Sequence, residues 1–161
     1  MNNMIKVGMA DGNVCRPPDG VTTLGLGSCV GIVLYDPVKK IAGLVHIMLP
    51  DSKKIINNAN KYKFADTGID MLILEMTKLG AVSKNLVAKI AGGAQMFSFS
   101  NNLEMMRIGE RNVEATKEKL KELRIPLVSE DTGANYGRTI EFYPETGLLH
   151  IRSVGKPTKI I

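Results

Sequence analysis

The sequence predicts an α+β fold, an antiparallel or mixed β-sandwich with helices outside the sheets. Two observations support this prediction. The segments with strand character come as hairpins, and only two segments show helical periodicity. The strands of the first hairpin are apolar on both faces, so both faces must be covered by helices or by a second sheet. A chain of 161 residues without a long linker or a break in composition predicts a single domain over residues 1–161.

The individual elements follow from periodicity and turn residues. Apolar residues recur at helical spacing over residues 65–79 and 110–123, and Gly80 is a residue type that commonly follows a helix end. The polar segment Asp51–Lys63 predicts a surface loop near the end of the first hairpin. The other predicted elements are a strand at 4–9, turns at 11–13 and 16–20, a glycine-rich turn and hairpin over 22–49, strands at 86–91 and 125–129, a second hairpin of 138–143 with 148–154, and a tail at 155–161. Residues 97–106 predict no defined element.

The charge and composition exclude several classes of protein. The net charge of +5 is compatible with an acidic protein partner. Lysine and arginine are scattered, tryptophan is absent and aromatic residues make up 5% of the chain, which argues against a nucleic-acid site. No run approaches the roughly 20 apolar residues of a membrane span. Because the N-terminus also lacks the apolar core of a signal peptide, we expect a cytoplasmic protein without direct membrane insertion.

The cysteines, histidines and glycines show no metal or nucleotide pattern. Cys15, Cys29, His46 and His150 lack the paired spacing of a zinc site, and two distant cysteines fit a reducing compartment. The Gly25-Leu26-Gly27 turn is not followed by the spacing of a dinucleotide or phosphate loop. We therefore expect no metal and no cofactor. Cys15 has no histidine or glycine turn nearby and is predicted to be inert.

The first hairpin brings a thiol close to an imidazole. Asp36-Pro37 is a turn signal between two apolar, β-branched runs. If residues beside this turn pair, Cys29 lies opposite a residue between His46 and Met48. Opposed residues share a face of the sheet, with Cβ atoms about 4.5–5.5 Å apart. The register therefore predicts the pair of groups that a thiol nucleophile requires.

Two interpretations of this cysteine remain open from the residues alone. A lone cysteine in an apolar strand is most often a small buried hydrophobe. The small residues before Cys29 favour a nucleophile, because a substrate can approach the sulfur and the amides around Gly27 and Ser28 can donate to an oxyanion. His46 is then the predicted base. His150 is predicted to be structural, since no Gly-Ser-Cys sequence precedes its hairpin partner.

Six motifs follow one another over nearly the whole chain. They are T-L-G-L-G-S-C-V-G (23–31), H-I-M-L-P (46–50), K-F-A-D-T (63–67), A-K-I-A-G-G-A-Q-M-F (88–97), I-G-E-R-N-V (108–113) and D-T-G-A-N-Y-G-R (131–138). In this order they resemble the CheD family of chemoreceptor glutamine deamidases. The resemblance implies a fold like that of the cytotoxic-factor deamidase toxins, with α/β/β/α layers. It also implies a catalytic threonine six residues before the cysteine, which is Thr23, with Thr22 as a minor alternative.

The function implied by the resemblance is hydrolysis of glutamine side chains on methyl-accepting chemotaxis receptors. Cys29 would form a thioester, His46 would act as base and acid, and Thr23 would orient the imidazole. Two other functions remain possible: a non-catalytic adaptor that docks on receptors, and an esterase for receptor glutamyl methyl esters.

The resemblance further implies a partner, a CheC-type phosphatase of the chemotaxis response regulator. We expect such a partner to cover the face that carries Cys29, with Lys53, Lys54 and Lys61 meeting acidic residues. Four other residues match the family pattern without an assigned chemical role: Gly93, Arg111, Asn112 and Arg138.

Overall fold

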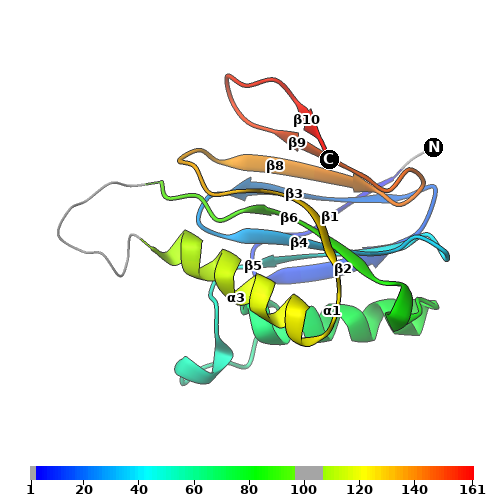
Figure 1. Ribbon diagram of the computed structural model, residues 1–161, viewed down its shortest axis with the longest axis horizontal. Helices are drawn as coiled ribbons and strands as arrows, with labels where there is room; N and C mark the ends of the chain where they lie inside the picture. Colours follow the sequence, from blue (N-terminus) through cyan, green and yellow to red (C-terminus); the bar gives the residue numbers. More distant parts are fainter. Residues whose placement is uncertain (1–2, 97–106) are drawn as a thin grey trace.

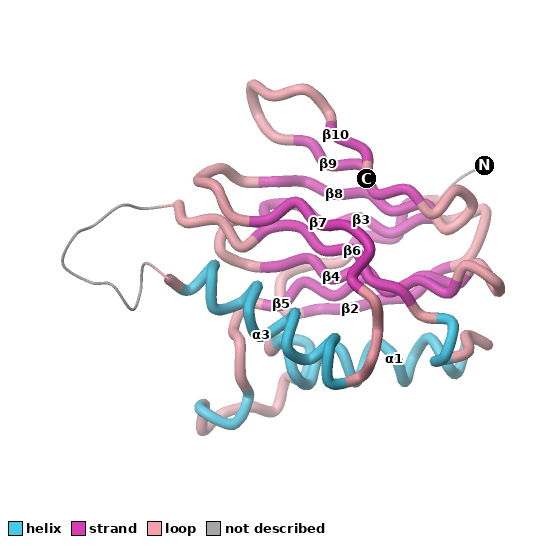
Figure 2. Tube along the Cα trace, in the orientation of Figure 1, coloured by secondary structure: helices cyan, strands magenta, loops and turns pink. Residues whose placement is uncertain are grey.

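The computed structural model describes residues 3–96 and 107–161 as two β-sheets packed face to face (Figures 1 and 2). Residues 97–106, for which the sequence predicted no element, lie outside the described residues. The strands are β1 (Met4–Lys6), β2 (Asp11–Cys15), β3 (Gly20–Leu26), β4 (Val30–Asp36), β5 (Ile41–Ile47), β6 (Val87–Gly92), β7 (Leu127–Thr132), β8 (Arg138–Tyr143), β9 (Leu148–Arg152) and β10 (Lys159–Ile160). The helices are α1 (Ala65–Leu79) and α3 (Ile108–Glu122), with short 3₁₀ turns η1 (Ser52–Lys54), η2 (Lys61–Lys63) and η3 (Ser83–Asn85).

Each sheet contains five strands, ordered β1-β3-β8-β9-β10 and β2-β5-β4-β6-β7. The hairpins β4–β5 and β8–β9 are antiparallel, whereas β1–β3 and β6–β7 pair in parallel. The sheets are therefore mixed, which confirms the predicted α+β sandwich. The β4–β5 hairpin forms as the turn signal predicted, with Asp36 paired to Ile41.

Strand β4 is central to the fold because both of its faces are buried. Its even-numbered apolar residues, such as Ile32, pack in a cluster with helix residues Leu72 and Leu120. Its odd-numbered residues, such as Val33, pack in a second cluster with Phe142 of the other sheet. Full burial of such side chains stabilises the fold by about 1.5–3 kcal/mol each.

Both described α-helices cover the same sheet, and this corrects the expected α/β/β/α layering. Figure 1 shows α1 and α3 together on the face of the β2-β5-β4-β6-β7 sheet, so the described layers are α/β/β. The outer face of the other sheet needs no helix, because its strands alternate. In β8, Ile140 and Phe142 point inward and are buried, while Glu141 points outward and pairs with Arg152 at 2.8 Å.

The observed ends of both helices lie within two residues of the predicted ends. Helix α1 occupies the predicted residues 65–79 and ends at Gly80, whose φ of 118° is in the region that favours glycine. Helix α3 begins two residues before the predicted start.

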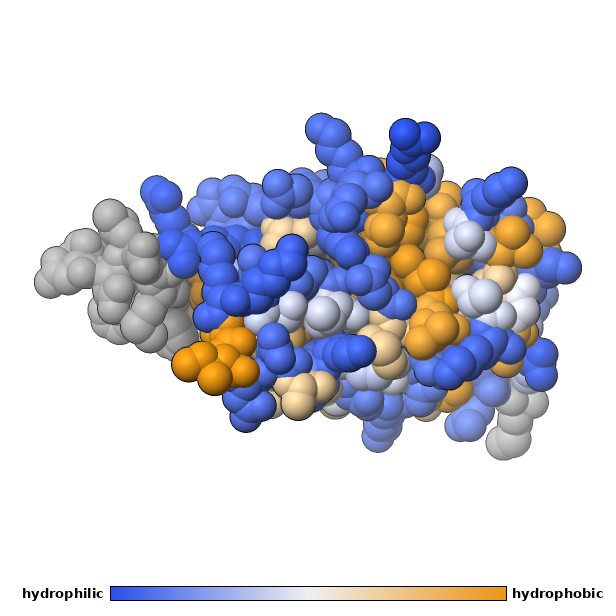
Figure 3. All heavy atoms as spheres, turned by 90° about the horizontal axis from the view of Figure 1, so that it is seen from below, coloured by the Kyte–Doolittle hydropathy of each residue, from blue (hydrophilic) through white to orange (hydrophobic). Residues whose placement is uncertain are grey.

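Seen from the helix side, the surface is largely hydrophilic with hydrophobic patches between (Figure 3).

Several strands were missed or shortened in the sequence analysis. Residues 11–13, expected to form a turn, belong to the edge strand β2 (Asp11–Cys15), which pairs with β5. The segment before Gly27, expected to be a glycine-rich turn, is the strand β3 of the opposite sheet. The tail contains the short strand β10, paired with β9. β2 and β10 are edge strands, which main-chain pairing determines and whose side chains carry little periodic signal.

Candidate active site

The turn Gly27–Cys29 carries the chain from β3 in one sheet to β4 in the other. Cys29 therefore lies at one end of the space between the sheets, where it packs against the inter-sheet cluster. The last pair of the β4–β5 ladder is Val30 with Ile47, which puts Cys29 opposite Met48.

The observed register lies within the predicted range, with Cys29 opposite Met48 and not directly opposite His46. His46 pairs with Gly31, so Cys29 and His46 are diagonal neighbours on the same face. Diagonal residues in an antiparallel pair lie about 7–8 Å apart, within reach of long side chains. Since Gly31 has no side chain, nothing projects from β4 directly opposite His46.

The carbonyl groups of the turn all point into the protein. Gly27 O accepts from Ala94 N at 2.8 Å, and Cys29 O accepts from Gly93 N at 2.8 Å. The carbonyl between them, that of Ser28, accepts from a side chain of α3 at 2.9 Å. Among the described residues, neither the Ser28 nor the Cys29 N–H donates to another residue, although the Cys29 backbone makes a hydrogen bond to its own thiol. Both amides are therefore unpaired with any other described residue, as donors to an oxyanion must be.

Gly92 and Gly93 allow this close approach. Gly92 has a φ of 112° and Gly93 a φ of 65°. A Cβ at Gly92 would overlap the Cys29 carbonyl oxygen, and one at Gly93 would overlap Val113 of α3. Gly93, whose role the sequence left open, thus holds the Cys29 carbonyl through its N–H.

Thr23 joins His46 across the two sheets. Thr23 Oγ1 lies 2.7 Å from His46 Nδ1 and donates to the Val7 carbonyl at 2.6 Å. A hydroxyl has one proton, so with that proton given to Val7 the contact requires the ring to donate Nδ1–H to Thr23. The neutral ring then carries a lone pair at Nε2. Thr22, the alternative, donates instead to Ile140 O at 2.7 Å on the other side of the strand.

Burial shifts the pKa values of both groups toward their neutral forms. Desolvation lowers the pKa of the His46 imidazole, and it raises the pKa of the partly buried Cys29 thiol despite a hydrogen bond from the cysteine's own backbone. His46 Nε2 is buried and has no hydrogen-bond partner among the described residues. The Cys29 thiol and the His46 imidazole, diagonal neighbours in the sheet, are therefore both uncharged near neutral pH.

The other cysteine and histidine lie away from this arrangement. Cys15 is buried in β2, and burial, with the charge of Asp19 adding to it, raises its pKa to about 12. His150 lies in β9, where it pairs with Glu141 and its ring contacts Tyr143. The described residues contain no cluster of three or more histidine, cysteine or acidic side chains that could hold a metal ion.

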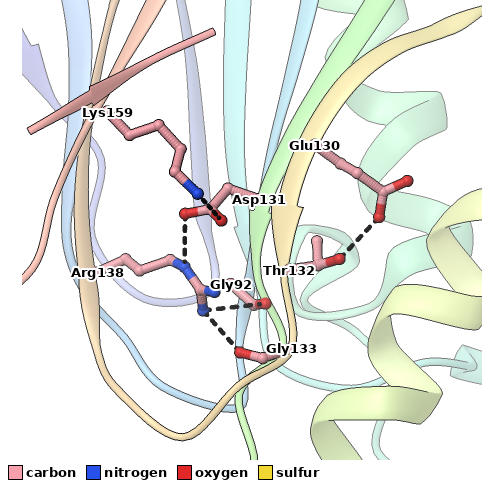
Figure 4. Close-up of polar contacts among 7 residues, drawn as sticks. All are labelled: Gly92, Glu130, Asp131, Thr132, Gly133, Arg138 and Lys159. Atoms are coloured by element: carbon pink, nitrogen blue, oxygen red, sulfur yellow. Dashed lines mark hydrogen bonds and ion pairs between the residues drawn. The ribbon is translucent and has the colours of Figure 1, made fainter.

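The buried Arg138 forms an ion pair with the mostly buried Asp131, close to Gly92 (Figure 4). Arg138 Nε contacts Asp131 at 3.1 Å, and its Nη1 donates to Gly133 O at 3.0 Å and to Gly92 O at 3.5 Å. Lys159 reaches the same carboxylate at 3.0 Å. Arg138 thus ties β8 to the ends of β6 and β7, next to the glycine pair that holds the Cys29 carbonyl.

Sequence reasoning missed the contribution of Val7 and left open the role of Asn112, the α3 residue that bonds Ser28 O. Val7 acts through its carbonyl, which no sequence pattern marks. Arg111 is exposed in the first half of α3.

The fold and the site have the parts that cysteine-dependent hydrolases use, a thiol, a base and exposed main-chain donors. A model of the family described as CheD chemotactic sensory transduction matches residues 48–153. The chain belongs to the CheD family, as the six motifs predicted. A protein of Lachnoclostridium phytofermentans named probable chemoreceptor glutamine deamidase CheD is 70% identical over the full length of both chains.

Two further relatives have similar names. A probable chemoreceptor glutamine deamidase CheD of Caldanaerobacter subterraneus is 62% identical, with 99% of each chain covered. The chemoreceptor glutamine deamidase CheD of Halalkalibacterium halodurans is 58% identical over the whole of both chains. A solved structure, the hypothetical protein YfiH of Bacillus licheniformis, has a TM-score of 0.48 and 18% identity, covering 78% of this chain and 51% of its own. Within the described residues, no helix is long and apolar enough to cross a membrane.

Proposed function

We propose that this protein is a chemoreceptor glutamine deamidase, a protein-glutamine glutaminase of the cytoplasm. It converts glutamine side chains on the cytoplasmic helices of methyl-accepting chemotaxis receptors to glutamate. The observation that supports the catalytic assignment best is the pair of hydrogen bonds of the Thr23 hydroxyl, to Val7 O and His46 Nδ1. They leave Nε2 of His46, the diagonal neighbour of Cys29, as a free acceptor. The names of relatives up to 70% identical support the substrate.

The first half of the reaction forms a thioester. Cys29 Sγ attacks the carbon of the glutamine amide while His46 Nε2 takes the thiol proton. The Ser28 and Cys29 amides donate to the oxygen, which becomes negatively charged in the tetrahedral intermediate, and Gly27 leaves room for it. When the intermediate collapses, the C–N bond breaks and His46 returns the proton to the nitrogen, which leaves as ammonia.

The second half of the reaction hydrolyses the thioester. His46 Nε2 takes a proton from water, whose oxygen attacks the thioester carbon, and the same main-chain donors stabilise the second oxyanion. The C–S bond then breaks, the proton returns to the sulfur, and glutamate is released. Thr23 holds the Nδ1–H side of the ring throughout and takes no proton.

We also propose that a CheC-type phosphatase binds over the Cys29 end of the molecule and competes with receptor. The segment that contains Lys53, Lys54 and Lys61 leaves β5 at Met48, beside the site. All three lysines are exposed, and none forms an ion pair with another described residue.

The experiment is mass spectrometry of a receptor cytoplasmic fragment incubated with the protein. Each deamidation exchanges an amide for an acid and raises the mass by about 1 Da, whereas hydrolysis of a methyl ester lowers it. Cys29→Ala and His46→Ala should abolish the increase, because groups that act as one unit lose activity together. His150→Ala is the matched control and should remain active. Full activity of Cys29→Ala would overturn the mechanism, and a receptor effect that survives without any mass change would indicate an adaptor.

A further inference from the structure

Asn112 is a fully buried polar residue in α3 that holds two carbonyls at the candidate site. Its Nδ2 donates to Ser28 O at 2.9 Å and to Met48 O at 3.0 Å. Two carbonyl oxygens can accept only from the NH₂ group, so the orientation of the amide is fixed. Its Oδ1 has no hydrogen-bond partner among the described residues. The side chain therefore serves as a double donor.

The two carbonyls lie where β4 and β5 separate. The ladder ends at the pair Val30 and Ile47, and the next amide of β5, Met48 N, donates to Lys63 O at 2.8 Å instead of pairing with β4. Asn112 takes the place of the missing ladder bond. It joins the residue before Cys29 to the end of the strand that carries His46.

The bond to Ser28 also fixes the direction of the Cys29 amide. A trans peptide is planar, and its C=O and N–H point in opposite directions. Because the Ser28 C=O points toward α3, the N–H of Cys29 points away from α3. That N–H donates to no other described residue, and its one hydrogen bond is to the thiol of Cys29 itself. Asn112 thereby determines where the donor nearest the nucleophile is aimed.

We infer that Asn112 is a positioning residue that aims the Cys29 N–H at the oxyanion of the tetrahedral intermediate. The inference rests on the proposed deamidation. Donors held in place before charge develops stabilise it without reorganisation during the reaction. The flanking carbonyls, of Gly27 and Cys29, are held by main-chain amides. The Ser28 carbonyl is the one of the three held by a side chain, so a substitution of Asn112 can remove its donor.

The test compares deamidation with alkylation in Asn112→Leu, a neutral change of similar size that removes both donors. Deamidation passes through an oxyanion, whereas iodoacetamide reacts with the thiolate by displacement and forms none. We expect kcat for deamidation of the receptor fragment to fall about 10- to 100-fold, with KM changed less than about twofold. Alkylation of Cys29 by iodoacetamide should change less than about twofold, because the thiol and His46 are untouched.

Thr116→Val is the matched control. Thr116 is buried one turn further along α3, and its hydroxyl bonds only the Asn112 carbonyl of the same helix, at 2.7 Å. The Thr116→Val variant should be less stable than the wild-type protein but should have the same kcat. Asn112→Ala provides a second variant if the leucine does not fit, with thermal unfolding recorded for all of them.

Each outcome decides the inference. Unchanged kcat in a folded Asn112 variant overturns it, and so does a parallel loss of deamidation and alkylation, which would mean that Asn112 acts on the thiol or on the fold. An inactive wild-type protein would instead refute the proposed deamidation, and the inference with it.

Discussion

Thr23 Oγ1 and His46 Nδ1 lie 2.7 Å apart, although they belong to strands of different sheets. Because the Thr23 proton is given to Val7 O, the contact determines the tautomer of the ring. Only the Nδ1–H tautomer leaves Nε2 able to take a proton from the thiol. The packing of the two sheets thus determines both the position of the His46 ring and its tautomer.

Thr23→Val should lower kcat for deamidation about 10- to 100-fold without unfolding the protein. Valine keeps the shape of the side chain but removes the acceptor of the His46 Nδ1–H, so the ring can rotate or adopt the other tautomer. Thr23→Ser retains the hydroxyl and should retain most of the activity. Kinetics on the receptor fragment check both variants, and equal activity of the valine and serine variants would exclude the orienting role.

The opposite pKa shifts of Cys29 and His46 predict separate pH profiles for deamidation and alkylation. Burial lowers the pKa of His46 below its usual 6.5, so the base stays neutral and kcat/KM should begin to fall only below that pH. Burial raises the pKa of Cys29 above its usual 9.0, so iodoacetamide labelling, which needs the thiolate, should still be rising at pH 9. A labelling rate that is already constant at pH 7 would show a preformed thiolate and contradict this account.

Cys15 is the internal control for the labelling experiment. Its pKa of about 12 and its 3% exposure predict slower labelling than Cys29 at every pH. His46→Ala should slow the labelling of Cys29 near pH 7 and leave that of Cys15 unchanged.

Arg138→Met should lower the free energy of unfolding by about 3–5 kcal/mol, because it leaves Asp131 buried with only Lys159 as ionic partner. Arg138→Lys should not restore this stability, since an ammonium cannot reproduce the planar fork that reaches Asp131, Gly92 and Gly133. The comparison is Arg152→Met, which breaks a half-exposed pair and should cost about 0–1 kcal/mol. Urea unfolding curves measure all three variants, and similar midpoints for the Arg138 and Arg152 variants would contradict the supporting role.

The parts of the site that the sequence predicted are those that depend on local pattern. The β4–β5 hairpin places Cys29 and His46 at one end because Asp36-Pro37 fixes the turn, although the register makes them diagonal rather than opposed. The carbonyl of Val7 reaches Thr23 from 16 positions away, and Asn112 reaches Ser28 from 84. Such contacts depend on how the two sheets and α3 pack, and no spacing in the sequence reveals them.

The sequence did not predict which face of each sheet the helices cover, because this also depends on how distant segments pack. Strands that are apolar on both faces require cover on both faces, but the cover of β4 is a helix on one side and a second sheet on the other. The outer side of that second sheet alternates, with Thr139, Glu141 and Tyr143 facing outward, and this pattern already argued against a fourth layer.

Binding of a CheC-type partner should slow both deamidation and alkylation of Cys29, and salt should weaken the effect. The loop with Lys53 and Lys54 is anchored beside the site, because Met48 N and Leu49 N both donate to Lys63 O, at 2.8 and 3.0 Å. A partner that meets these lysines would therefore also cover the end of the hairpin. Charges of this kind act mainly on the association rate and are screened within about 8–10 Å at moderate ionic strength.

Charge reversal at Lys53 and Lys54, compared with charge reversal at a control lysine, tests the proposed partner surface. The double change Lys53→Glu, Lys54→Glu should lower the association rate of the partner about 10-fold or more at low salt and reduce its protection of Cys29 from iodoacetamide. Lys84→Glu changes an exposed lysine of η3, next to the Asn85 that bonds Asp36 at the far end of the hairpin, and should leave binding unaffected. Labelling and deamidation rates are followed as the partner is titrated. If a saturating partner changes neither rate, the partner binds elsewhere on the protein. If Lys84→Glu weakens partner binding as much as the double change does, the net charge of the protein attracts the partner, and this loop does not.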